Sequence, residues 1–270
     1  MATGAVLCKQ ELKNILRKDR NYYSTPELND VLFLHFKGYR KIEALEEFTG
    51  LRTLHAETNA FGKIEGLDTC TRLRSLYLQE NCIRKIENLQ KLTDLRTLNL
   101  SSNLIDRIEN LEENTLLSTL LLEKNYIGRN GRGDFDNLVG LKCLSVLDLS
   151  GNHIDDPALV FEVLTELPAL KVLYLKGNPV VRKIPDYRKT LIVTLRNLAF
   201  LDDRPVFEEE RRCATAFFQG GIEAERGELK KIREEKLATA EKNREAFLKL
   251  VEEAQQQGRE IQRMRAEDRA

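Results

Sequence analysis

Hydrophobic positions recur every 22 residues through the first half of the chain. Leucine occupies residues 32, 54, 76, 98 and 120, asparagine occupies residues 59, 81, 103 and 125, and the triplet KIE or RIE begins at residues 41, 63, 85 and 107. Around each leucine, apolar and polar residues alternate as in a short strand that is buried on one face. One such unit cannot bury its apolar face alone, so the pattern predicts stacked copies with adjacent strands.

The clearest copies read LRSLYLQENCI from Leu73, LRTLNLSSNLI from Leu95 and LSVLDLSGNHI from Leu144. This is the LxxLxLxxNxI pattern of a leucine-rich repeat, which predicts an α/β solenoid with a parallel sheet on its concave side. We expect seven strands, centred on leucines 32, 54, 76, 98, 120, 147 and 173, and a partial eighth that ends at Leu201.

The later repeats are longer than 22 residues. We interpret the glycine-rich GRNGRGDF, which follows Ile127 and includes residues 128–134, as a flexible surface loop, and PALVFEVLTEL as a convex helix. At the end of each strand, a buried asparagine amide can bond neighbouring backbone groups. The asparagines that we assign to this structural role are Asn59, Asn81, Asn103, Asn125, Asn152 and Asn178.

The two ends depart from the repeat, as the ends of a solenoid must in order to cover its core. The segment 1–27 predicts a helical N-terminal cap, with a further helix start at Pro26, and 28–206 the solenoid with its C-terminal cap. We expect 207–221 to be a linker or cap extension and 222–270 a long charged helix. The residues expected to form the C-terminal cap are Tyr187, Leu195, Leu198, Leu201 and Asp202.

The charged helix carries a weak heptad of apolar residues. Arg244 and Gly258 interrupt the seam, so the sequence leaves open whether this helix forms a stable coiled coil. The apolar positions of the seam are Ala240, Phe247, Val251, Ala254 and Ile261.

Composition narrows the class of protein. Lysine plus arginine equals aspartate plus glutamate, 43 against 43, so no general basic excess indicates nucleic-acid or membrane binding. The N-terminus lacks the apolar core of a secretory signal, and the five scattered cysteines have no CxxC spacing. We expect a cytoplasmic protein with reduced thiols.

Only three histidines are present and no catalytic or phosphate-binding motif occurs, so we expect no enzyme, cofactor or metal site.

The concave face is the candidate functional surface, because solenoids commonly bind partners there. Aromatic residues beside polar ones are typical of a protein-binding patch, and here they concentrate between Phe33 and Tyr77. The candidate residues are Phe33, His35, His55, Glu57, Tyr77, Gln79, Asn99, Asp148, Tyr174 and Lys176.

Three strings carry a family resemblance. NPVVRKIPDYRKTLIVTLRNLAFLDD resembles the C-terminal cap of the short leucine-rich repeat class. YSTPELNDVLFLHFKGYRKIEALEEFTGL and LDDRPVFEEERRCATAFFQGGIEAERGE closely resemble the dynein axonemal assembly factor 1 family, and the resemblance covers roughly residues 21–228. It implies a non-enzymatic scaffold for cytoplasmic preassembly of axonemal dynein arms in cilium biogenesis. Its implied partners are axonemal dynein subunits or the chaperone and co-chaperone machinery.

The sequence leaves two alternative functions open. One is a structural subunit of the axoneme or microtubule, similar to a dynein light chain, which the balanced charge of residues 223–270 neither favours nor excludes. The other is an RNA-associated module, which is weaker because no basic face or RNP-like aromatic motif is present.

Overall fold

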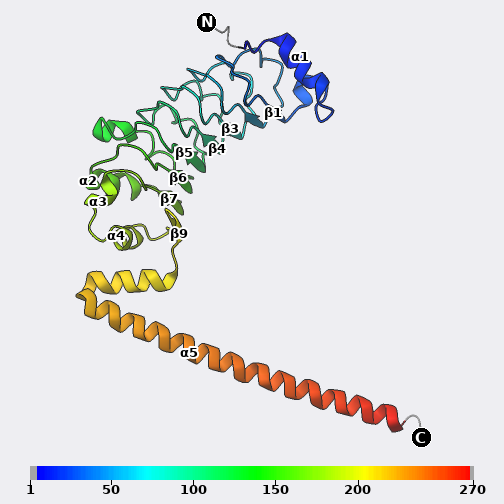
Figure 1. The fold of residues 1–270 in the computed structure, drawn as a ribbon, viewed down its shortest axis with the longest axis vertical. Helices are drawn as coiled ribbons and strands as arrows, with labels where there is room; N and C mark the ends of the chain where they lie inside the picture. Colours follow the sequence, from blue (N-terminus) through cyan, green and yellow to red (C-terminus); the bar gives the residue numbers. More distant parts are fainter. Residues whose placement is uncertain (1–4, 268–270) are drawn as a thin grey trace. The chain divides into compact units, whose positions relative to one another are not determined.

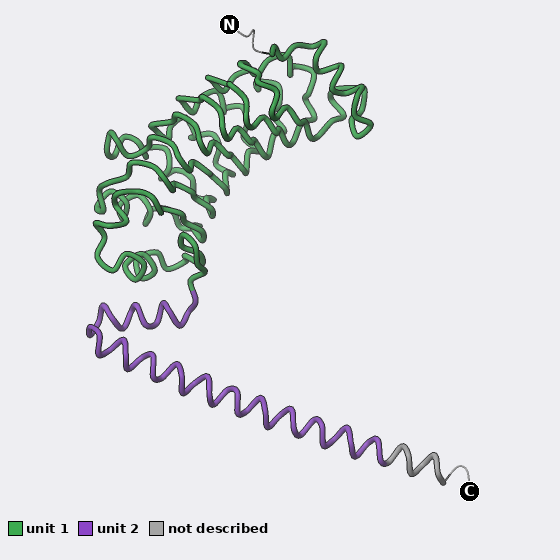
Figure 2. The backbone as a smooth tube through the Cα atoms, viewed as in Figure 1, with its two compact units in different colours: residues 1–206 green, residues 207–270 purple. Residues whose placement is uncertain are grey.

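The structure is a computed structural model that describes the backbone of residues 5–267 and the side chains of residues 5–259. The chain divides into two compact units, residues 1–206 and residues 207–270 (Figure 2). The predicted cap and charged helix extend into residues 1–4 and 268–270, which lie outside the described residues, as does the side chain of Ile261.

The first unit is a leucine-rich repeat solenoid, as predicted, with its strands side by side along one face (Figure 1). One sheet runs in chain order, parallel from β1 to β8, and the last pair is antiparallel. Each central leucine pairs with the leucine of the next strand, for example Leu54 with Leu76. The strands are β1 (Val31–Phe33), β2 (Thr53–His55), β3 (Ser75–Tyr77), β4 (Thr97–Asn99), β5 (Thr119–Leu121), β6 (Val146–Asp148), β7 (Val172–Tyr174), β8 (Phe200–Leu201) and β9 (Arg204–Pro205).

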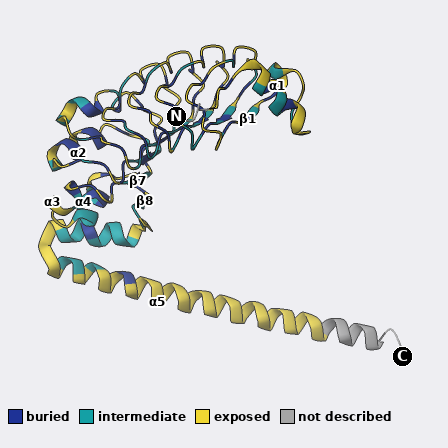
Figure 3. Ribbon diagram, turned by 45° about the horizontal axis from the view of Figure 1, so that its top comes forward, coloured by how far each residue is buried: buried dark blue, intermediate teal, exposed yellow. Residues whose placement is uncertain are grey.

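The core lies between the sheet and the convex turns (Figure 3). The strand leucines point into it, and the isoleucines of the KIE and RIE triplets, such as Ile64, Ile86 and Ile108, close it from the other side. All of these side chains are completely buried, so every repeat contributes one layer to a single continuous core.

The asparagines bond backbone groups as predicted. Asn103 donates from Nδ2 to the carbonyl oxygens of Leu78 at 2.9 Å and Leu100 at 3.0 Å, and its Oδ1 accepts from the Ile83 amide at 3.0 Å. Because Leu78 and Ile83 belong to the preceding repeat, each such side chain joins two repeats. The same pattern recurs at the buried Asn81, Asn125, Asn152 and Asn178 and at the half-buried Asn59.

The N-terminal cap contains the helix α1 (Lys9–Lys18), which buries Leu12 and Leu16. The helix start expected at Pro26 is only the single 3-10 turn η1 (Pro26–Leu28), and the Thr25 side chain makes no capping hydrogen bond. The turn is closed instead by Asn29, whose Nδ2 donates to the carbonyl oxygens of Thr25 and Tyr23, both at 3.0 Å.

The segment after Ile127, predicted as a flexible surface loop, is exposed at Arg129, Asn130 and Arg132 but contains a short helix with two buried residues. Residues Gly131–Phe135 form the 3-10 helix η2, in which Asp134 is 0% and Phe135 is 3% exposed. The Asp134 carboxylate accepts from the amides of Gly128 at 2.8 Å and Asn130 at 3.0 Å, while Phe135 packs into the core. The expected convex helix is present as α2 (Pro157–Leu164).

The C-terminal cap covers the last repeat with α3 (Val180–Lys183), α4 (Tyr187–Thr194) and the β8–β9 pair. Leu195, Leu198 and Leu201 are buried, as expected of a lid. Asp202 takes the place of the next asparagine, because its Oδ1 accepts from the amides of Leu175 at 2.7 Å and Lys176 at 2.9 Å. The Tyr187 hydroxyl donates to the other carboxylate oxygen at 2.8 Å.

The second unit is built from α5 (Glu208–Glu267), which non-helical backbone at Gly220 and Gly221 divides into two parts. Gly221 has φ 71°, a left-handed conformation that glycine adopts without a side-chain clash. The segment 207–221, expected as a linker or a cap extension, is therefore helical from Glu208 up to these glycines. Three acidic residues in the first turn favour this start, because they face the positive end of the helix dipole.

Candidate functional site

The parallel register aligns the candidate side chains in two columns on the concave face. The first column follows the last residue of each strand, so that Phe33 pairs with His55 and His55 with Tyr77. It continues through Asn99, Leu121, Asp148 and Tyr174. The second column lies two residues further along, where the amide of Phe36 still donates to the carbonyl of Glu57.

The N-terminal end of the first column is a stack of rings. The Phe33 and His55 ring centroids are 4.7 Å apart with an interplanar angle of 21°, and those of His55 and Tyr77 are 4.6 Å apart at 10°. His35 meets Phe33 edge-on at 5.7 Å. The structure thus brings together these four residues, which the sequence predicted would form the aromatic end of the surface.

The same ring cluster includes one residue that the sequence analysis missed. Phe36 is 70% exposed and meets His35 edge-on at 5.4 Å. It adopts φ 55°, as do the equivalent residues Thr58 and Glu80 at 53° and 57°. An aromatic residue at a position that is polar in these repeats was the signal that could have identified it.

The C-terminal end of the concave face has its polar groups paired within the chain. The Asp148 carboxylate accepts from the amide and hydroxyl of Ser150 at 2.9 and 2.5 Å, and burial raises the pKa of this carboxyl above its usual value. Lys176 donates to Asp203 at 2.7 Å, and the Tyr174 ring lies 5.8 Å from that of Phe200. The structure separates this end from the aromatic stack by Asn99 and Leu121.

Near the aromatic stack, by contrast, buried polar atoms lack partners. Within the described side chains, the buried nitrogen and oxygen atoms without a hydrogen-bond partner are His35 Nδ1, Glu57 Oε2, Gln79 Oε1 and Asn114 Oδ1. The first three belong to consecutive positions of the second column. Unpaired buried polar groups are costly and are rare in folded proteins, so these three neighbouring atoms mark a part of the concave face with unused hydrogen-bonding capacity.

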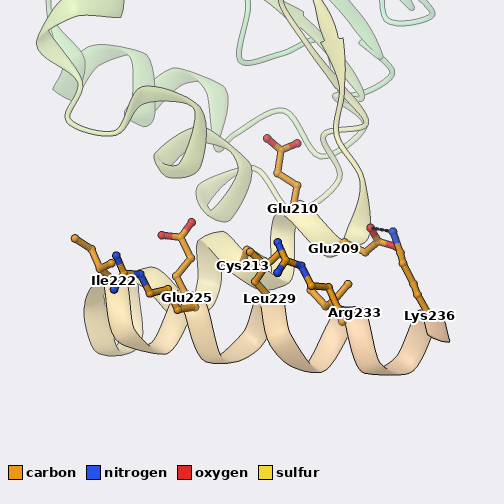
Figure 4. A pocket seen from close by; sticks show the side chains of 10 residues that line it. Glu209, Glu210, Cys213, Ile222, Glu225, Leu229, Arg233 and Lys236 are labelled. Carbon is orange, nitrogen blue, oxygen red and sulfur yellow. Dashed lines mark hydrogen bonds and ion pairs between the residues drawn. The ribbon is translucent and has the colours of Figure 1, made fainter. Parts of the chain in front are cut away.

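A groove within residues 207–270 is a further candidate surface (Figure 4). The two parts of α5 line a groove with the apolar side chains of Ile222, Leu229 and Ile232, and charged side chains surround it. Lys236 donates to Glu209 at 2.6 Å, and Arg212 donates to Glu228 and Glu235. Sequence reasoning missed this groove because it depends on the chain reversal at the two glycines.

Neither the concave face nor the groove of α5 carries a cluster of metal ligands among the described residues. In the part of the chain that the structure describes, no group of three or more His, Cys, Asp or Glu side chains is arranged to hold a metal ion. Over the same residues, each helix is too short or too polar to cross a lipid bilayer. The concave arrangement of rings and polar atoms is suited to non-covalent recognition.

A capped solenoid with a parallel concave sheet and a ladder of asparagines defines the leucine-rich repeat class. The leucine-rich repeat family model matches residues 67–232, and the chain belongs to this family.

Its similarity to particular relatives goes further. The chain is 58% identical over 249 residues to human dynein axonemal assembly factor 1, covering 92% of the chain and 34% of the human protein. It is 55% identical over 225 residues to the dynein axonemal assembly factor 1 homolog of Drosophila pseudoobscura pseudoobscura, covering 83% of the chain and 14% of that protein. A leucine-rich repeat-containing protein named ODA7, from Chlamydomonas reinhardtii, is 43% identical over 114 residues, 42% of the chain and 26% of that protein. The chain therefore spans about a third or less of the length of these relatives.

Solved structures agree with the fold. An internalin from Listeria monocytogenes (inlF) matches with a TM-score of 0.54 at 26% identity, covering 65% of this chain and 48% of the internalin. A leucine-rich repeat protein from Leptospira interrogans matches with a TM-score of 0.50 at 26% identity, covering 63% of this chain and 41% of the other.

Proposed function

We propose that the chain is a non-enzymatic scaffold that acts in the cytoplasm in the assembly of axonemal dynein arms for cilia or flagella. The observation that carries the proposal is the 58% identity over 249 residues to human dynein axonemal assembly factor 1. Identity at this level covers most of the chain. The partners we propose are axonemal dynein subunits or the chaperones and co-chaperones that fold them.

The concave face supplies a physical basis for such a scaffold. The stacked rings of Phe33, His55 and Tyr77 offer flat apolar area next to unpaired polar atoms, which is the composition of a protein-binding hot spot. Stacked rings also hold each other in place, so binding them costs little side-chain entropy.

Removal and rescue in ciliated cells test this function. We expect cells that lack the protein to have axonemes without dynein arms when cross-sections are viewed by electron microscopy. We expect the full-length protein to restore the arms, and a Phe33→Ala, Tyr77→Ala double variant to restore few of them, because truncating one anchor at a hot spot costs about 2 kcal/mol or more. A matched control is Leu116→Ala, an exposed residue outside the concave columns.

Fractionation of the same cells separates assembly from a structural role. Recovery of the protein with the cytosol supports assembly. Retention in salt-washed axonemes would support a permanent axonemal subunit instead, and normal arms in cells without the protein would contradict both roles.

A further inference from the structure

We propose that the N-terminal end of the concave face binds a protein segment through an exposed arginine side chain. The site is formed by the ring stack of Phe33, His55 and Tyr77 and by the adjacent column of His35, Glu57 and Gln79. The binding of arginine is argued here from this chain alone. It rests on the proposed function in one respect, the kind of protein that carries the arginine: an axonemal dynein subunit, a chaperone or a co-chaperone.

The first argument is the chemistry of the unpaired atoms. Glu57 Oε2 and Gln79 Oε1 are hydrogen-bond acceptors, and both are buried without a donor. The other oxygen of Glu57 lies 3.5 Å from Nδ1 of His55, so the carboxylate is held beside the ring stack. A ligand that pairs these two oxygens must supply donors, and a positive charge is favoured beside a carboxylate.

The second argument is the shape of the neighbouring surface. His55 lies between Phe33 and Tyr77, so its two faces are covered. On the other side of Tyr77 the strand register places Asn99, which has no aromatic ring to stack on Tyr77. A guanidinium is flat, stacks on aromatic faces and carries five N–H donors, whereas an ammonium is a compact charge without a face.

The third argument is a filled version of the same arrangement elsewhere in the chain. The rings of Tyr126 and His153 stack at 5.6 Å with an angle of 15°, and the guanidinium carbon of Arg129 lies 4.5 Å from the Tyr126 centroid. Arg129 also donates to Nε2 of His153 at 3.0 Å. The His55–Tyr77 pair is also stacked, at 4.6 Å and 10°, and the adjacent acceptors Glu57 Oε2 and Gln79 Oε1 are unpaired.

The edge of the concave face where the strands begin is positively charged, whereas the second column, which follows the strands, carries the carboxylate of Glu57. Arg52, Arg74 and Arg96 are exposed at the residue before each of three consecutive strands. They would attract an acidic segment, so a charge-reversed probe distinguishes recognition by this edge from recognition by Glu57 and Gln79.

The test uses the full chain, labelled with ¹³C in its histidines, and the peptide acetyl-Gly-Arg-Gly-amide at millimolar concentration. The chain contains three histidines, of which His35 and His55 lie in the proposed site and His153 does not. We expect saturable shifts of the His35 and His55 imidazole signals and none at His153. We expect a weaker response to the lysine peptide and no saturable shift with the glutamate peptide.

Substitutions in the second column test whether Glu57 and Gln79 bind the arginine. We expect Glu57→Gln to weaken arginine-peptide binding at least about tenfold, because a hydrogen bond to a charged group is lost. Gln79→Glu adds a second carboxylate and should strengthen binding. Glu123→Gln is the matched control, since Glu123 occupies the same column two repeats beyond Gln79 and is paired with Lys124 at 3.0 Å.

Equal effects of Glu57→Gln and Glu123→Gln would overturn the proposal, as would shifts with the glutamate peptide that match those with arginine. An equal response to lysine would overturn the preference for arginine. The cell experiment is independent: dynein arms lost without the protein, together with no peptide binding, contradict this inference alone. Peptide binding together with normal arms contradicts the proposed function alone.

Discussion

Asn103 shows how a single side chain can join two repeats. Its amide donates to carbonyls of its own repeat and of the preceding one, and its oxygen accepts from Ile83 of the preceding repeat. Asn103→Ala leaves these buried backbone groups without partners, and an unsatisfied buried group costs about 1–3 kcal/mol. We expect the free energy of unfolding to fall by about 3 kcal/mol in urea titrations followed by circular dichroism.

Asn99→Ala is the matched control for that measurement. Among the described residues, the half-buried Asn99 accepts only from the amide of Ser101, at 3.1 Å, and donates no bond to another repeat. We expect it to cost less than about 1 kcal/mol. Equal losses in the two variants would show that the ladder does not stabilise the stack.

At the scale of an element, the C-terminal cap depends on the Tyr187–Asp202 pair. Burial, and then the charge of Asp202, raise the pKa of the Tyr187 hydroxyl well above its usual value near 10. At pH values just above 10, the folded state therefore keeps this proton, whereas an unfolded tyrosine releases it. The hydroxyl's contribution to stability is fully present below pH 10 and decreases as the pH rises above it.

Tyr187→Phe tests this linkage. At neutral pH we expect the variant to be less stable by about 1–3 kcal/mol, because one oxygen of Asp202 loses its donor. Above pH 10 the difference from the original chain should narrow by about 1.4 kcal/mol per pH unit. Tyr22 and Tyr39, whose pKa values burial also raises, are present in both chains and cancel in the difference. Parallel stability curves from pH 7 to about pH 11 would contradict the prediction, and the exposed Tyr23→Phe is the control.

The elements also show which parts of the structure a sequence can predict. The strands and the concave columns follow from the LxxLxLxxN pattern. It recurs every 22 residues from Leu32 to Leu120, and it still marks the strands at Leu147 and Leu173, where the repeats are longer. The insertion after Ile127 has no such period, and its order depends on Asp134 folding back onto the amides of Gly128 and Asn130. Its glycines suggested flexibility, whereas the buried carboxylate and Phe135 hold it in place.

At the scale of the whole molecule, the candidate site was predictable as a set of positions but not as a set of contacts. Alternation places Phe33, His55 and Tyr77 on one face in any regular stack. Which of the neighbouring polar atoms find partners depends on side-chain geometry, as the contrast between the unpaired Oε2 of Glu57 and the paired Oδ1 of Asp148 shows. The groove of the second unit was also missed, because no period crosses the two glycines that reverse the chain.

The second unit gives a last prediction, on whether the weak heptad pairs. Every described side chain from Arg233 to Arg259 is exposed, including Phe247 at 64% and Leu250 at 63%. An isolated helix without a buried face opens easily, whereas the strands of a solenoid open only with their neighbours. We expect amides of residues 237–259 to exchange with deuterium within minutes at low micromolar protein, far faster than those of β3 to β6. Phe247→Ser should leave that rate nearly unchanged. Protection that grows with protein concentration and disappears in Phe247→Ser would instead show that a second copy covers this face, because only a pairing seam responds to both changes.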